Sequence, residues 1–277
     1  MRFGLDRAAN FEGDHWHLHG FKSIDVAAEQ AGMDFSEAAQ CIKNASNKLL
    51  ALRNLRTWPG LDDKILASWN GLMIKGMSVA GRVLGRDDWV ASAQRALDFV
   101  RSQMMVDGRL LATSRNGTSS LNAYLDDHAL LIDAVLSLLE CQWREGDLNF
   151  ALALADALLE RFHDPQGGGF FFTSNDHEQL LHRPKPMLDD ALPSGNGVAA
   201  RVLIRLGHLS GRNDFLLAAG STLRAGWESI QAYPHAHNAL LDALEEWRHR
   251  RPPSLCAANW MTSPPGNDSQ ANATCPP

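Results

Sequence analysis

Residues 69–100 read WNGLMIKGMSVAGRVLGRDDWVASAQRALDFV, and this stretch decides the fold class. Apolar and small side chains fill two adjacent rows at helical spacing between Trp69 and Leu84, so the segment predicts a helix that is buried on more than one side. Gly85 ends this helix, and a second one begins after Asp87-Asp88. Helices joined by so short a turn pack antiparallel, and the stretch therefore predicts a helical hairpin.

The same unit recurs downstream at a spacing of about 40–65 residues. Each hairpin is a helix, a short turn that follows a glycine, and a second helix, and a longer loop leads to the next hairpin. Two of these loops carry short apolar runs, Arg109–Thr113 and Phe170–Phe172, that predict strands. The further predicted helices are Ala129–Glu140, a partner that Asp147 caps, one from Ser194 to Gly211, one from Asp214 to Ile230, and one from Pro234.

The two ends of the chain differ from this repeat. We expect residues 1–23 to be irregular, residues 24–251 to form an incomplete toroid of hairpins, and residues 252–277 to be a disordered or divergent tail rich in Pro, Ser and Asn. The pattern turns helical at Ile24, and Ser36 is the predicted N-cap of a helix that reaches Leu55.

Composition excludes several classes of function. The chain has 277 residues, 45% of them apolar, and a net charge of −6. No run of about 18 apolar residues predicts a membrane span, and no basic stripe predicts a nucleic-acid partner. We see no apolar stretch of a secretory signal near the start, and we therefore expect a cytoplasmic protein with four reduced cysteines, at positions Cys41, Cys141, Cys256 and Cys275.

Metal and cofactor chemistry is not expected. His15, His17 and His19 alternate and would share one face of a strand, but no fourth ligand accompanies them. We predict neither a metal site nor a bound cofactor.

Polar residues gather where the predicted inner helices begin. If alternate helices run in the same direction, these residues share one end of the fold and form a site for a small-molecule ligand. An indole beside amides suits a sugar ring, and the cationic Lys185 suits its hydroxyls. The candidate ligand-binding residues are Trp69, Asn70, Tyr124, Lys185, Ser194 and Asn196, and the candidate catalytic residues are Asp126, Asp127, His128, Asp190 and His237.

Five stretches resemble one protein family, the thioredoxin-domain-containing proteins similar to spermatogenesis-associated protein 20. They occur in order over residues 8–250 and read NFEG at 10–13, DDKILASWNGLMI at 62–74, AYLDDHALLI at 123–132, DPQGGGFFFT at 164–173 and RPKPMLDDALPSGNGVAA at 183–200. The resemblance implies an all-α, partial (α/α)6 toroid like those of six-hairpin glycosidases and N-acylglucosamine 2-epimerases, with short strands in its long loops. It also implies that the family's thioredoxin-like domain and first hairpins are absent from this chain.

Three functions follow from this resemblance, and the sequence does not choose among them. Glycoside hydrolysis needs two carboxylates, for which Asp127 and Asp190 are the candidates. Epimerisation of a sugar needs groups that exchange a carbon-bound proton, for which His128 and His237 are the candidates. A non-catalytic module would bind a ligand and serve a thioredoxin-like domain supplied elsewhere.

Overall fold

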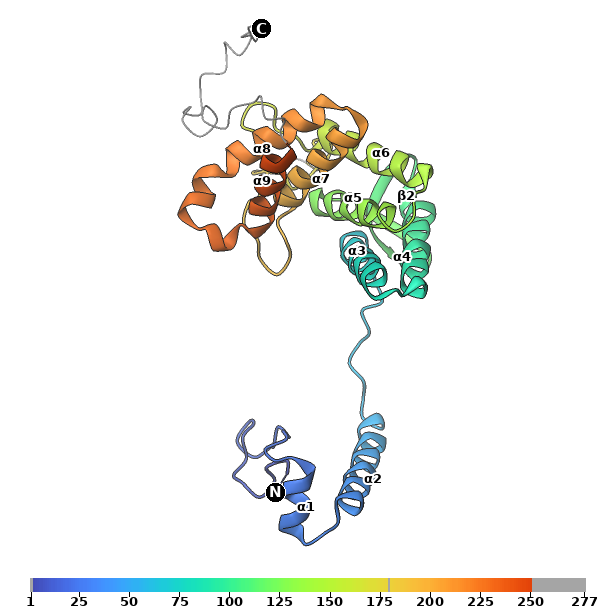
Figure 1. The fold of residues 1–277 in the computed structure, drawn as a ribbon, viewed down its shortest axis with the longest axis vertical. Coiled ribbons are helices and arrows are strands. Elements are labelled where there is room, and N and C mark those ends of the chain that lie inside the picture. The colour runs from blue at the N-terminus through green and yellow to red at the C-terminus, as the bar shows by residue number, and fades with distance from the viewer. Residues whose placement is uncertain (1, 179, 251–277) are drawn as a thin grey trace. The chain divides into compact units, whose positions relative to one another are not determined.

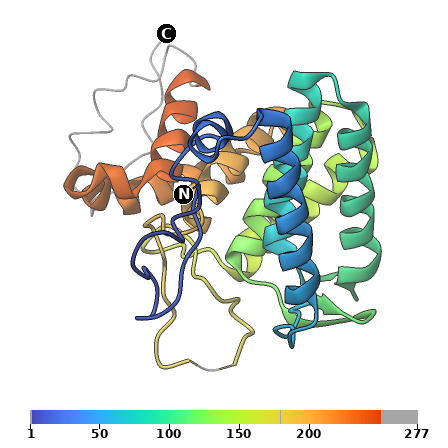
Figure 2. The ribbon, with the colours of Figure 1, turned by 90° about the horizontal axis from the view of Figure 1, so that it is seen from below.

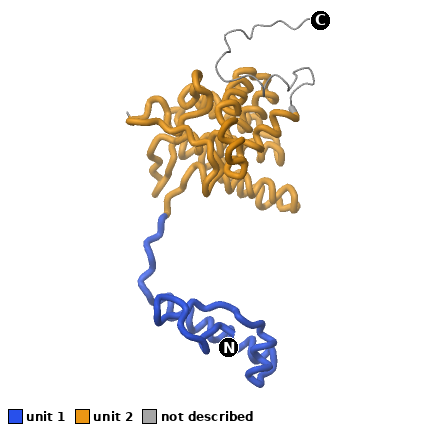
Figure 3. The backbone as a smooth tube through the Cα atoms, turned by 90° about the vertical axis from the view of Figure 1, so that its left-hand side faces the viewer, with its two compact units in different colours: residues 1–62 blue, residues 63–277 orange. Residues whose placement is uncertain are grey.

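The computed structural model describes residues 2–178 and 180–250. The chain divides into two compact units, residues 1–62 and residues 63–277 (Figure 3). The predicted tail at 252–277 lies outside the described residues, and the predicted domain limits stay predictions. Within the described part of the chain, no helix has the length and the apolar character that crossing a bilayer requires.

The first unit contains the helices α1 (Ile24–Ala31) and α2 (Phe35–Asn54). The carboxylate of Asp34 accepts a hydrogen bond from the Glu37 N–H at 3.2 Å and caps α2. The predicted cap at Ser36 is wrong, because Ser36 already lies inside the first turn. Asp34 stands three residues before Glu37, which is the spacing at which a cap reaches an unpaired N–H.

The second unit is a double layer of helical hairpins (Figures 1 and 2). Helices α3, α5, α7 and α9 pack side by side as an inner layer, and each outer helix lies against the inner helix that precedes it. This arrangement confirms the predicted all-α class built of hairpins. The inner helices are α3 (Ala67–Leu84), α5 (Leu125–Leu139), α7 (Gly195–Ser210) and α9 (Asn238–Arg250), and the outer helices are α4 (Asp87–Phe99), α6 (Glu145–Arg161) and α8 (Asn213–Ala232).

Short elements connect the hairpins. A π-helical turn, η1 (Val100–Met104), extends α4, and a 3-10 turn, η2 (Pro234–Ala236), precedes α9. A small antiparallel sheet places β3 (Arg109–Arg115) between its neighbours, and β3 confirms the predicted strand at 109–113. The predicted strand at 170–172 is reduced to a single bridge between His163 and Phe170. The strands that pair with β3 are β1 (Ile65–Leu66), β2 (Met105–Val106) and β4 (Thr118–Asn122).

Helix α5 is the centre of the inner layer, with α3 on one side and α7 on the other. Every residue of α5 is buried except Asp126. In the middle of the helix, the buried carboxylate of Asp133 accepts hydrogen bonds from Lys75 of α3 at 2.7 Å and from Arg201 of α7 at 2.6 Å. One buried charge thus fixes the register of three inner helices, because it needs both partners to offset its desolvation.

The start of α6 differs from the prediction. The helix begins at Glu145, and Asp147 lies within its first turn instead of capping it. The buried carboxylate of Asp147 binds Arg101 at 3.0 Å and Arg144 at 3.4 Å. Asp147 forms ion pairs with two arginines, and it therefore does not mark the start of the helix.

Close packing of α3 on α5 generates a test of the fold. A Cβ at Gly71 would lie 2.9 Å from the backbone carbonyl of Leu130, so Gly71→Ala should lower the free energy of unfolding by about 1–3 kcal/mol. Gly76, in the same helix, faces open space, and Gly76→Ala should raise stability by about 0.4–1 kcal/mol. Urea unfolding of both variants measures this contrast, and equal effects would refute the predicted helix contact.

Candidate functional site

The carboxylate of Asp127 joins the starts of two inner helices. Its Oδ1 accepts the N–H of Ser68 in α3 at 2.9 Å, and its Oδ2 accepts the N–H of Tyr124, the N-cap of α5, at 2.9 Å. Both are N–H groups at helix starts that have no partner within their helix. Burial raises the pKa of Asp127 above its ordinary value, and the two N–H groups oppose that shift.

The carboxylate of Asp189 joins the starts of the other two inner helices, α7 and α9. Its Oδ1 accepts the N–H of Ser194, the N-cap of α7, at 2.8 Å, and its Oδ2 accepts the N–H of Ala239 in α9 at 3.0 Å. The Ser194 hydroxyl in turn accepts the N–H of Gly197 at 3.4 Å and caps α7. Two carboxylates thus pair the inner helices at their N-terminal ends.

The segment after α6 links these two pairs. Asn196 of α7 accepts the N–H of Phe170 at 2.7 Å and donates to the carbonyls of Phe170 at 3.0 Å and Pro186 at 2.8 Å. Two residues after Phe170, the carbonyl of Phe172 accepts the N–H of Leu125 in α5 at 3.0 Å. A continuous set of hydrogen bonds therefore brings the polar clusters of the four inner helices to one end of the unit.

Asp126 is the carboxyl group that this network leaves available. Its Oδ1 is buried and has no hydrogen-bond partner among the described residues. Burial, and secondly the charge of Asp127, raise its pKa to about 6. The oxygen lies against the start of α7, where a Cβ in place of the Gly195 hydrogen would overlap it. A carboxyl group with this pKa holds a proton in mildly acidic solution and releases it near neutrality.

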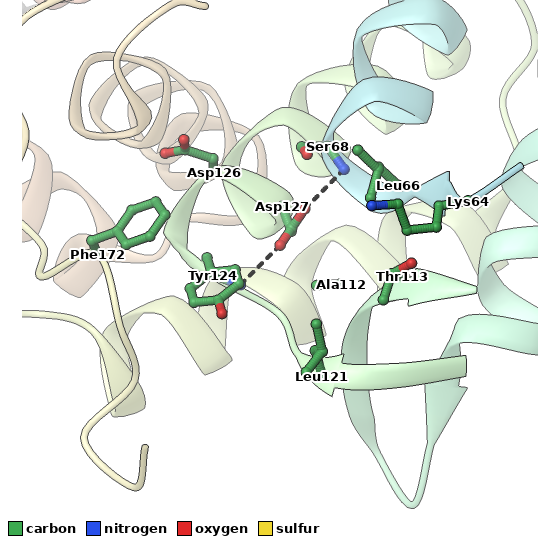
Figure 4. Close-up of a pocket in the computed structure, with 10 residues that line it drawn as sticks. All are labelled: Lys64, Leu66, Ser68, Ala112, Thr113, Leu121, Tyr124, Asp126, Asp127 and Phe172. Carbon is green, nitrogen blue, oxygen red and sulfur yellow. Dashed lines mark hydrogen bonds between the residues drawn. The ribbon is translucent and has the colours of Figure 1, made fainter. Parts of the chain in front are cut away.

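A pocket of about 230 Å³ opens beside the two carboxyl groups (Figure 4). Figure 4 shows Asp126 and Asp127 pointing in different directions from neighbouring positions of α5. The rings of Tyr124 and Phe172 stack at 4.9 Å between centroids and form part of its wall. The lining residues are Lys64, Leu66, Ser68, Ala112, Thr113, Leu121, Tyr124, Asp126, Asp127 and Phe172. The pocket is below the typical range of about 300–1,000 Å³ for small-molecule sites, which suits a ligand the size of one ring.

The two candidate histidines lie outside this lining. His128 is buried in α5, its Nδ1 is 3.0 Å from the Tyr124 carbonyl, and its ring packs against Phe162. Burial lowers its pKa to about 4, so the imidazole is neutral at pH 7. His237 is fully buried before α9 and hydrogen-bonds the Tyr233 carbonyl through Nδ1 at 2.7 Å. Neither ring faces the pocket, and their catalytic roles stay predictions.

Six other candidates also lie apart from the pocket lining, and two of them, Ser194 and Asn196, belong to the hydrogen-bond network described above. Trp69 is 62% exposed on α3, and Asn70 donates at 2.9 Å to the carbonyl of Leu66, the N-cap of the same helix. Lys185 forms an ion pair with Asp164 at 2.7 Å and also donates to the Gly168 carbonyl, so it holds the glycine loop closed. Asp190 is exposed.

Several residues that line the pocket are not among the candidates predicted from the sequence. Lys64 lies within the family-like stretch at 62–74 but was not a candidate, and Phe172 belongs to a run that predicted only a strand. Thr113 and Leu121 come from the β3–β4 hairpin. The signal for Thr113 was a hydroxyl that interrupts the apolar run Leu110–Ala112, but strand pairing across the loop was needed to place it.

Comparison with solved structures defines the class of fold. A GH76 α-mannanase of Bacteroides thetaiotaomicron superposes with a TM-score of 0.53 at 14% identity, over 70% of this chain and 55% of that one. A family 76 glycoside hydrolase from a bovine strain of that species gives a TM-score of 0.50 at 15% identity, over 61% of this chain and 36% of that one. A cellobiose 2-epimerase of Bacillus thermoamylovorans gives 0.49 at 12% identity, over 68% of this chain and 60% of that one. The two glycoside hydrolases show that the part of the chain they cover has the fold of the six-hairpin glycosidase-like toroids, which confirms the predicted architecture.

Sequence comparison identifies the relatives, although no family model matches the chain. Human spermatogenesis-associated protein 20 is 32% identical over 233 residues, which cover 80% of this chain and 30% of the human protein. The mouse protein is 30% identical over 262 residues, which cover 87% of this chain and 33% of the mouse protein. The chain is homologous to spermatogenesis-associated protein 20 and spans about a third of the length of these relatives.

The bridging role of Asp127 generates a first test of the site. Asn in place of Asp127 keeps the shape but offers one acceptor oxygen to two N–H groups, so Asp127→Asn should lower the free energy of unfolding by about 1–3 kcal/mol. Urea unfolding at pH 7 measures the loss, with the exposed Asp190→Asn as control. If the two variants are equally stable, Asp127 does not hold α3 to α5.

The raised pKa of Asp126 predicts an opposite effect for the neighbouring residue. The native carboxyl holds its proton up to about pH 6, whereas the unfolded one releases it near pH 4, so the wild-type protein loses stability as the pH rises between these values. Asp126→Asn removes this loss and should raise the free energy of unfolding by about 1–3 kcal/mol at pH 8. Unfolding at pH 4 and pH 8 checks the sign, and an equal gain at both values would contradict it.

Proposed function

We propose that the pocket at the start of α5 binds a sugar ring and that the protein is a glycoside hydrolase in which Asp126 is the general acid. The observation that carries this proposal is the state of Asp126. It lines the pocket, its Oδ1 has no partner among the described residues, and its pKa is raised to about 6. A proton donor to a glycosidic oxygen needs a carboxyl group that is still protonated at the working pH.

Asp127 supplies the second carboxyl group that glycoside hydrolysis requires. It also lines the pocket, and its two hydrogen bonds to N–H groups favour the ionised form against the effect of burial. In this proposal Asp126 protonates the leaving oxygen as the glycosidic bond breaks, a water molecule bonds to the anomeric carbon, and the proton that this water loses returns to the Asp126 carboxylate. The charge of Asp127 stabilises the positive charge that develops on the sugar ring.

The wall of the pocket fits such a substrate. Tyr124 and Phe172 offer aromatic surface to the apolar face of a ring, and Lys64 and Thr113 add polar groups. The fold supports the same class of ligand, because the α-mannanase that superposes on this chain is a glycoside hydrolase. We therefore propose α-mannosides as the first substrates to test.

Epimerisation is the less favoured chemistry. The histidines proposed for proton exchange are buried outside the pocket lining, and burial holds the pKa of His128 near 4. A non-catalytic module remains the second candidate, and one observation favours it: both oxygens of Asp127 are already bonded to backbone N–H groups. In that case the pocket would bind a sugar for a thioredoxin-like domain supplied elsewhere.

Hydrolysis of nitrophenyl α-mannoside and of α-mannan oligosaccharides by the full chain tests the proposal. Asp126→Asn should reduce kcat/KM by about 10²–10⁴-fold, the usual contribution of a general acid, while the exposed Asp190→Asn should leave it unchanged. For the wild-type protein, kcat/KM should fall as the pH rises through about 6, because Asp126 then loses the proton it donates.

Other outcomes identify the competing functions. Binding of methyl α-mannoside without release of product by the wild-type protein would overturn hydrolysis in favour of the binding module. Incorporation of deuterium next to the carbonyl carbon of a free sugar in heavy water would overturn it in favour of epimerisation.

A further inference from the structure

The β3–β4 hairpin forms the wall of the pocket that lies across from the aromatic rings (Figure 4). Its register pairs Thr113 with Ser120 and Leu111 with Asn122. These pairs bracket Ala112 and Leu121, so both strands of the hairpin contribute side chains at the same level. Ala112, Thr113 and Leu121 all line the pocket.

Thr113 presents a hydroxyl group that the protein itself does not use. Thr113 is only 8% exposed, and its Oγ1 has no hydrogen-bond partner among the described residues. A buried hydroxyl without a partner is unfavourable in the free protein, because it has lost its hydrogen bonds to water. Thr113 lines the pocket, so a ligand bound there would supply the missing partner.

Leu121 carries an unfavourable conformation of a different kind. Its backbone has a φ of 64°, in the left-handed region that a leucine rarely adopts. The same residue is 63% exposed, so burial in the protein does not offset this strain. Strain of this kind persists where the surrounding structure enforces it, and it is concentrated at ligand sites. Here it turns an apolar side chain toward the pocket.

We propose that Thr113 and Leu121 form a recognition subsite on the β3–β4 hairpin that determines which sugar the pocket accepts. The Thr113 hydroxyl hydrogen-bonds one hydroxyl of the ring, and Leu121 covers an apolar face of the same ring. This inference rests on the proposed sugar binding but not on catalysis. It assigns selectivity to the hairpin, whereas the carboxyl groups that act on the glycosidic bond belong to α5.

Binding measurements on the full chain test the subsite directly. The probes are methyl α-mannoside and its epimers at C2 and C4, methyl α-glucoside and methyl α-taloside, titrated by calorimetry. Thr113→Val keeps the shape of the side chain and should weaken binding of the preferred sugar by about 3- to 10-fold, which reduces the preference over the epimer that lacks the matching hydroxyl. Leu121→Asn fits the left-handed backbone and should weaken binding of all three sugars by a similar factor.

Stability without ligand separates this role from a structural one. Thr113→Val should not lower the urea midpoint, because it removes a hydroxyl that has no partner in the part of the chain that the structure describes. Thr173 is a matched control, since its Oγ1 is equally buried and unpartnered among the described residues but lies outside the pocket lining. Thr173→Val should have the same effect on the midpoint and none on binding. Val106, an exposed apolar residue of β2, gives the matching control for Leu121 as Val106→Asn.

Two results would overturn the subsite. If the wild-type protein binds a sugar and both Thr113→Val and Leu121→Asn bind the three probes as it does, the pocket selects its ligand elsewhere, and the proposed function still stands. If the wild-type protein binds none of the probes, the subsite and the proposed function both fail. Binding without turnover, with the predicted losses in the two variants, would support the subsite and overturn hydrolysis alone.

Discussion

The site depends on one kind of interaction, a carboxylate shared between the N-terminal ends of two inner helices. Asp127 joins α3 to α5, and Asp189 joins α7 to α9. A helix start has N–H groups without partners and a partial positive charge, so one carboxylate between two starts satisfies both and holds the helices at a common level. The segment from Phe170 to Phe172 then links the two pairs. Without this network the polar residues of four separate loops would have no fixed relation to one another.

Because of this arrangement, the adjacent acids Asp126 and Asp127 have different roles. Asp127 is the third residue of α5, where a carboxylate reaches back to the N-cap, and it is therefore consumed by the network. Asp126 is turned away from those N–H groups by the 100° step of the helix, toward Gly195 of α7 and the pocket. Burial among neighbouring helices and the adjacent charge then raise its pKa. The same packing that satisfies one acid leaves the buried Oδ1 of the other without a hydrogen-bond partner among the described residues, which is the condition for a reactive carboxyl group.

The sequence predicts the fold better than it predicts the site. Helix periodicity, the stop at Gly85 and the cap at Ser194 are local features, and the structure confirms the helices they indicate. The gathering of polar residues at one end also follows from the alternation of helices. The direction of each side chain cannot be predicted from this alternation, because one helical step decides whether a residue faces the pocket or a neighbouring helix. Trp69 and Lys185 therefore lie away from the lining, one on the surface and one in an ion pair. Thr113 and Leu121 reach it through strand pairing that no local pattern encodes.

The inner layer of helices and the β3–β4 hairpin differ in how well they tolerate substitution. Below the network, Asp133 binds Lys75 and Arg201, so α3, α5 and α7 are held at their starts and again at their middles. A shift of any one helix would leave a buried charge or a helix-start N–H unpaired, and this makes the position of Asp126 resistant to substitution elsewhere. The side chains of the hairpin wall are under no such constraint, since the Thr113 hydroxyl has no partner among the described residues and Leu121 is largely exposed. A rigid carboxyl group beside a replaceable wall allows one scaffold to keep its chemistry while its ligand changes, because substitutions in the hairpin alter contacts with the ligand without disturbing the helix starts.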